Sequence, residues 1–70
     1  MFLYSTRERE RDNLRVRGTV RMHTIESMEL DCQYRGLPAT ACHQQAMPYW
    51  EEWAQEFPEL AKQRALGRSQ

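Results

Sequence analysis

The chain has 70 residues, of which 40% are hydrophobic and 29% are charged, and this composition excludes a disordered tail and a multidomain protein. Ten basic and ten acidic residues give a formal net charge of zero, so the chain as a whole has no strong attraction for nucleic acid or for an anionic membrane. No apolar run approaches the roughly 20 residues that span a bilayer. We therefore expect one domain over residues 1–70 in the cytoplasm, where the two cysteines would be free thiols.

The first half of the chain alternates apolar and polar residues, which is the pattern of half-buried β-strands. The alternation predicts strands over about residues 14–24 and 28–35, joined by a turn at 25–27. We expect a third strand over about residues 2–6. Residues 5–8 also fit the capping box of a helix, but no apolar stripe follows them, and the strand is preferred.

The polar face of this predicted sheet suggests a strand register. One register places Arg21 opposite Asp31 and His23 opposite Glu29, and each such pair of opposite charges stabilises a ladder by roughly 0.2 to 1 kcal/mol. The alternative register places only Arg21 opposite Glu29. The first register is preferred because it satisfies more charges while it keeps apolar residues on one face.

The second half of the chain has the periodicity of helices. The spacing predicts helices over about residues 39–47, 48–57 and 58–66, because Pro48 and Pro58 each favour the start of a new helix. The apolar residues of the last two helices recur at helical spacing and form one stripe: Trp50, Trp53, Ala54, Phe57, Leu60 and Ala61.

Together these elements predict an α+β fold, in which a small antiparallel sheet of two or three strands packs against the C-terminal helices. The apolar face of the sheet would include Val20 and Leu30. Since that face needs a cover, we expect the tryptophan-bearing helix to pack on it as core rather than to serve as a partner anchor.

Residue types that support chemistry are few. The soft metal ligands number only four, and their spacing includes no CxxC or HxxxH pair, so we expect no zinc site: they are His23, Cys32, Cys42 and His43. No nucleophile, base and orienting acid fall in a recognisable arrangement. We therefore expect no metal, no cofactor and no enzymatic activity.

Two charged groups of residues are the candidate partner-binding sites. Arg15 and Arg17 have no acid opposite them in the preferred register. Glu52, Glu56 and Glu59 stand at i, i+4 and i+7, and so would form one acidic ridge. Such a ridge would dock on a basic surface of a protein partner.

The sequence favours a small non-catalytic interaction protein that binds and modulates, or inhibits, a larger protein or protein complex, as accessory proteins of phages and mobile elements do. The alternative is a nucleic-acid-binding regulator that uses an arginine-rich face of the sheet. We expect no membrane partner, and a homodimer is compatible with the pattern.

Overall fold

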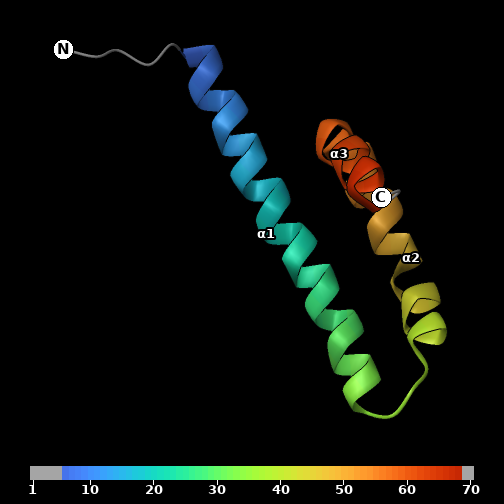
Figure 1. Cartoon of the computed structure of the whole chain (residues 1–70). Helices are drawn as coiled ribbons and strands as arrows, with labels where there is room; N and C mark the ends of the chain where they lie inside the picture. The colour runs from blue at the N-terminus through green and yellow to red at the C-terminus, as the bar shows by residue number, and fades with distance from the viewer. Residues whose placement is uncertain (1–5, 69–70) are drawn as a thin grey trace.

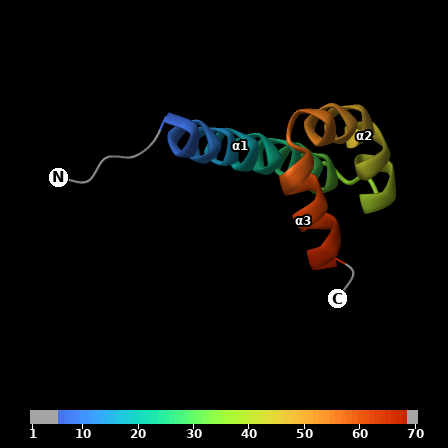
Figure 2. The same ribbon diagram turned by 90° about the horizontal axis from the view of Figure 1, so that it is seen from above.

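The computed structural model describes residues 6–68, which form three α-helices. Helix α1 spans Thr6–Tyr34, α2 spans Ala39–Glu56 and α3 spans Pro58–Arg68. Helix α2 runs back along the C-terminal half of α1, and α3 leaves the end of α2 at a steep angle and crosses α1 (Figures 1 and 2). The N-terminal half of α1 extends beyond both other helices.

The predicted α+β fold is wrong, because residues 6–68 contain no strand. The strand expected at 14–24 lies within the single 29-residue helix α1, and so does the strand expected at 28–35 apart from Arg35, which lies in the turn after α1. The strand expected at 2–6 lies outside the described residues, apart from Thr6, which begins α1.

Helix geometry explains why the alternating pattern was misleading. Residues two apart on an α-helix lie about 200° apart around its axis, so alternating apolar residues fall on two opposite sides of α1. One side faces the other helices and carries Met22 and the buried Ile25. The other side carries Val20 and Leu30, which the strand prediction assigned to the core and which are 58% and 65% exposed.

The ion pairs of α1 also differ from the predicted cross-strand pairs. Arg21 pairs with Glu56 of α2 and not with Asp31. The Nδ1 atom of His23 lies 3.1 Å from a carboxylate oxygen of Glu26, one helical turn away, instead of facing Glu29. These are the i, i+3 and tertiary contacts of a packed helix.

Helix α1 ends in a Schellman motif built on Gly36, which has a φ of 103°. The Gly36 amide donates to the Gln33 carbonyl at 2.9 Å, and the Leu37 amide donates to the Cys32 carbonyl at 3.4 Å. Glycine is suited to this position because it adopts the left-handed conformation without a Cβ penalty. The motif reverses the chain so that α2 can return along α1.

A disulfide between Cys32 and Cys42 joins the last turn of α1 to the first turn of α2, with the two Cα atoms 5.8 Å apart. The prediction of two free thiols is therefore wrong. Sequence spacing did not indicate the bond, because the distance between the two cysteines depends on how the chain reverses between α1 and α2. The bond fastens the end of the α1–α2 pair that lies farthest from α3 (Figure 1).

Helix α2 is continuous across Pro48, so the prediction of separate helices at 39–47 and 48–57 is wrong. A proline inside a helix costs roughly 3 kcal/mol, but Pro48 lies on the exposed side of α2. The buried side continues past it without interruption, through Ala46 and Trp50. Packing of that side against α1 outweighs the backbone cost.

Helix α2 ends at Glu56 because Phe57 precedes Pro58. A proline excludes the preceding residue from the helical region, and Phe57 has φ −129° and ψ 65°. The Phe57 carbonyl then accepts a hydrogen bond from the Ala61 amide at 3.0 Å, which helps to start α3. The helix predicted at 58–66 is confirmed and extends to Arg68.

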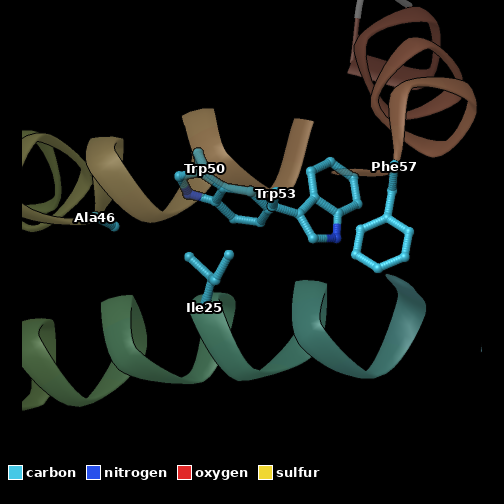
Figure 3. Close-up of a cluster of buried hydrophobic side chains, with 5 residues drawn as sticks. All are labelled: Ile25, Ala46, Trp50, Trp53 and Phe57. Carbon is cyan, nitrogen blue, oxygen red and sulfur yellow. The ribbon is translucent and has the colours of Figure 1, made fainter. Parts of the chain in front are cut away.

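The hydrophobic core lies where the three helices meet. Five buried side chains form it: Ile25, Ala46, Trp50, Trp53 and Phe57 (Figure 3). The two indole rings meet edge to face with centroids 5.4 Å apart. The expectation that the tryptophan stripe is core is confirmed, although its cover is helix α1 and not a sheet.

The α1–α2 contact has a close-approach point at Gly18. The Trp53 indole nitrogen donates a hydrogen bond of 2.8 Å to the Gly18 carbonyl, which satisfies the only polar atom of a side chain that is 2% exposed. A Cβ atom at position 18 would lie 2.9 Å from a ring carbon of Phe57 and would also clash with Leu60. The absence of a side chain is therefore a packing requirement of the three-helix junction.

Candidate functional site

A groove of about 480 Å³ lies between the N-terminal half of α1 and the corner where α2 meets α3. The groove exists because α1 continues past this corner, and neither α2 nor α3 packs on the part of α1 that lies beyond it (Figures 1 and 2). The apolar residues of the groove come from both walls, and we call them the groove floor: Leu14, Phe57, Pro58 and Leu60.

The groove floor is partly open to solvent. Leu14 is 49% exposed, whereas Phe57 is only 5% exposed because its other side packs in the core. The turn at Pro58 places both residues of the Phe57–Pro58 pair against the groove. An apolar side chain of about the size of leucine or phenylalanine could cover this floor, and its burial would stabilise a complex by about 1.5 to 3 kcal/mol before the cost of association.

The two sides of the groove carry opposite charges. Arg11 and Arg15 lie one turn apart on α1 and form a basic rim. Glu56 and Glu59 lie on either side of the α2–α3 break and form an acidic rim.

One charged residue of the rims already forms an ion pair within the chain, and three others do not. Glu56 forms an ion pair with Arg21, and the Arg21 guanidinium carbon lies 5.6 Å from the centroid of the Phe57 ring. For Arg11, Arg15 and Glu59, no ion pair is found with any residue from 6 to 68. These three charges are thus available to a partner.

The structure brings together three of the five predicted site residues. Arg15, Glu56 and Glu59 all line the groove. Arg17 lies about 200° from Arg15 around the axis of α1 and so points to the other side of that helix. Glu52 is exposed on α2 but does not line the groove.

Sequence reasoning missed Arg11 and Leu14 as members of this site. Their spacing with Arg15 is that of one helical face, so the groove wall was visible in the sequence once α1 was taken as a helix. The floor could not be found in this way, because Leu60 reaches the same groove only through the turn at Pro58.

A polar cluster fastens α1 to α2 beside the core. The Glu29 carboxylate is 15% exposed and accepts a hydrogen bond of 3.0 Å from the Trp50 indole nitrogen. Its other oxygen lies 2.9 Å from Nδ1 of His43. The Arg64 guanidinium carbon lies 3.9 Å from the centroid of the Trp50 ring. Both carboxylate oxygens of Glu29 and the indole nitrogen of Trp50 thus have protein partners, as buried polar atoms in a structural contact require.

The sequence offered four soft metal ligands, and the structure assigns each of them another partner. Cys32 and Cys42 are bonded to each other, so neither is a thiolate ligand in this state. His43 contacts Glu29 and His23 contacts Glu26. Among residues 6–68 no group of three or more His, Cys, Asp or Glu side chains is arranged to hold a metal ion.

Among the helices of residues 6–68, none combines the length and the apolar character that crossing a membrane requires. Comparison of the chain with protein-family models, with curated proteins and with solved structures finds no match in any of the three.

Proposed function

We propose that this chain is a small non-catalytic interaction protein that binds a larger protein partner through the groove between α1 and α3. The observation that supports the proposal is an apolar floor bordered by a basic rim on one side and an acidic rim on the other. Concave apolar surfaces with a few convergent charges are typical binding sites. Modulation of that partner, as in accessory proteins of phages and mobile elements, is part of the same proposal.

The occupant that fits the groove is an exposed segment of the partner with a large apolar residue between an acid and a base. The apolar side chain would cover Leu14 and Phe57. The partner's acid would face Arg11 and Arg15, and its base would face Glu59. Complementary charges of this kind fix the direction of the segment and raise its association rate.

The residue types of the groove favour binding over catalysis. Its lining contains arginines, carboxylates, Gln63 and apolar side chains, and no Cys, His or Ser from residues 6–68 is among them. Glu56 is already paired with Arg21. A hydrolytic or transfer reaction would need a nucleophile with an adjacent base.

The nucleic-acid alternative depended on one sheet face that carried six arginines: Arg7, Arg9, Arg11, Arg15, Arg17 and Arg21. On helix α1, Arg15 and Arg17 point to opposite sides, and Arg21 pairs with Glu56. This separation favours the protein partner over a phosphate backbone. A fluorescent random-sequence duplex, titrated at low and moderate salt, should show no steeply salt-dependent binding.

The cytoplasmic location stays a prediction. It implied two free thiols, and the Cys32–Cys42 disulfide counts against it, because disulfides persist mainly in oxidising compartments. Alkylation of thiols in intact cells, followed by mass measurement, tests the location. Modification of both cysteines agrees with the cytoplasm, and protection of both contradicts it.

Selection from a random peptide library on the immobilised protein tests the groove. The selected peptides should share a large apolar residue between an acid and a base. Leu14→Glu should weaken their binding by more than about tenfold, which corresponds to 1.4 kcal/mol. The matched control is Leu66→Glu, because Leu66 is 61% exposed on α3 and lies outside the groove.

Charge variants complete the test with matched controls. Arg15→Glu and Glu59→Arg should each weaken the selected peptides, whereas Arg17→Glu and Glu52→Arg should leave their affinity within about twofold, as expected for exposed charges outside a site. Peptides that bind all four variants equally, or that tolerate Leu14→Glu, would contradict the assignment of the groove.

A further inference from the structure

Helix α1 carries a second apolar stripe on the side that faces away from α2 and α3. It consists of four residues, which we call the outer stripe: Val16, Val20, Leu30 and Tyr34. Their exposed fractions are 61%, 58%, 65% and 92%. The core-facing residues of α1, among them Ile25, lie on the opposite side of the helix axis. No part of chain 6–68 covers the outer stripe (Figures 1 and 2).

The spacing of the outer stripe is that of a coiled-coil seam. With His23 and Ser27 included, one side of α1 has residues at positions 16, 20, 23, 27, 30 and 34. The steps alternate between four and three, which is the heptad spacing that lets one helix pack along another. The seam is apolar at both ends and polar in the middle.

The seam is also symmetric about position 25. Val16 and Tyr34 lie at equal distances before and after this position, and Val20 and Leu30 do so as well. A twofold contact requires that residue i of one copy touch residue j of the other, and that j touch i. Two antiparallel copies of α1 centred on position 25 meet this requirement.

In that arrangement each apolar residue of the seam faces an apolar residue. Val16 would lie opposite Tyr34 of the second copy, and Val20 opposite its Leu30. At the centre, His23 of each copy would face Ser27 of the other, and these two equivalent polar layers favour one register over its neighbours. A shift by one heptad toward the N-terminus would place the valines against His23 and Ser27, and would place Leu30 and Tyr34 against the polar residues Asn13 and Arg9.

The charges of α1 favour the antiparallel orientation. Residues 6–20 hold five arginines and three acids, whereas residues 26–35 hold three acids and one base, Arg35, which pairs with Asp31 at 3.0 Å. An antiparallel pair places the basic half of each helix beside the acidic half of the other, and a parallel pair would place like halves together. Arg17 and Asp31 follow Val16 and Leu30 in the sequence, so they would flank the same turn of the seam from the two copies.

We propose that the outer stripe is the contact between two antiparallel copies of this chain. Leu14 and Arg11, which line the groove, lie about 160° and 140° around the axis of α1 from Val16, whereas Arg15 and Arg17 flank the outer stripe on its two sides at about 100° each. A dimer would therefore leave both grooves open, and the inference does not depend on the proposed function. Arg17, which lies away from the groove, is an interface charge in this arrangement.

Sedimentation equilibrium of the full chain, from micromolar to near-millimolar concentrations, tests the contact. The mass should rise from 8.4 kDa toward twice that value. Val20→Glu and, independently, Leu30→Glu should each raise the dimer dissociation constant by more than about tenfold, because an unpaired carboxylate would be buried twice per dimer. Leu66→Glu, on α3, is the control and should dimerise as the wild type does.

The stability of the variants separates a lost contact from a lost fold. Val20 and Leu30 are exposed in the single chain, so circular dichroism and thermal unfolding of dilute Val20→Glu should match the dilute wild type. A wild-type protein that remains monomeric at all concentrations overturns the proposal. A dimer that Val20→Glu and Leu30→Glu leave intact overturns it as well.

The orientation has its own test. Arg17→Asp should weaken the dimer, and the combination with Asp31→Arg should restore it. Under mild oxidation, a mixture of Val20→Cys and Leu30→Cys should form the mixed disulfide faster than either variant forms its own dimer. Faster crosslinking of Val20→Cys to itself would indicate a parallel pair and would overturn the antiparallel contact.

Discussion

Substitution of glycine by alanine at position 18 should destabilise this protein, in opposition to helix propensity. In the interior of an isolated helix, alanine is favoured over glycine by roughly 1 kcal/mol. Gly18 lies in the middle of α1, in a helical conformation, and is buried. Propensity alone therefore predicts that Gly18→Ala is stabilising.

The neighbours of Gly18 reverse this expectation. A Cβ atom would lie 2.9 and 3.0 Å from two ring carbons of Phe57 and would also clash with Leu60. The end of the Leu60 side chain can rotate away, but the Phe57 ring is 5% exposed and packs against the core. Overpacking of this kind costs roughly 1 to 3 kcal/mol. Subtraction of the gain of roughly 1 kcal/mol in propensity leaves a net loss of about 0 to 2 kcal/mol in the free energy of unfolding, centred near 1 kcal/mol.

The other two glycines serve as matched controls. A Cβ atom at Gly67 meets no atom within 4 Å, so Gly67→Ala, near the end of α3, should be neutral or stabilising by a few tenths of a kcal/mol. Gly36 also has open space around it, but its φ is 103°. Gly36→Ala should therefore cost about 1 kcal/mol through backbone strain alone.

Urea unfolding followed by far-UV circular dichroism measures all three changes, and unfolding midpoints should be compared at equal slopes. The measurement should be made at a low protein concentration, so that association does not contribute to stability. If Gly18→Ala is as stable as Gly67→Ala, or more stable than the wild type, then α3 does not press on α1 at this point. The assignment of Gly18 as the close-approach point would then be wrong.

Two other features give predictions for the same assay. Cys32→Ser combined with Cys42→Ser should lower the free energy of unfolding by about 2 to 3 kcal/mol, which is the value that the loop-closure relation gives for a sequence separation of 10. A loss below about 0.5 kcal/mol would show that the disulfide constrains the unfolded chain very little. Glu29→Gln should lower the free energy of unfolding by about 1 kcal/mol, because the charged acceptor of the Trp50 indole becomes neutral. The control Glu52→Gln, at an exposed position, should change it by less than about 0.5 kcal/mol. Equal effects at the two positions would contradict the role of Glu29 in holding α1 against α2.

The sequence by itself determined that the second half is helical and that a helix begins at Pro58, because periodicity and proline act locally, but it did not determine that α2 continues across Pro48. Pro58 excludes Phe57 from the helical region whatever packs around it, and α3 begins there as predicted. The tryptophan stripe was also recognisable as core, since Trp50 and Trp53 recur at helical spacing with Phe57.

The secondary structure of the first half could be decided only from the tertiary structure, because the alternating pattern of apolar residues fits both a strand and a helix. Alternating apolar residues describe a strand with one buried face, and they equally describe a helix with apolar stripes on two opposite sides. Packing of α2 on Gly18 and Ile25 decides for the helix. Val20 then falls on the outer stripe, where no local signal distinguishes it from a core residue.

The candidate site also combines features that the sequence determines with features that only the tertiary structure determines. Charge and exposure of Arg15, Glu56 and Glu59 were readable from the sequence, because charged residues seldom lie buried. Their convergence on one groove was not readable, since it depends on how far α1 extends past the turn at Pro58. Distances between helices are set by side-chain packing and by the Cys32–Cys42 bond, and spacing along the chain contains no measure of them.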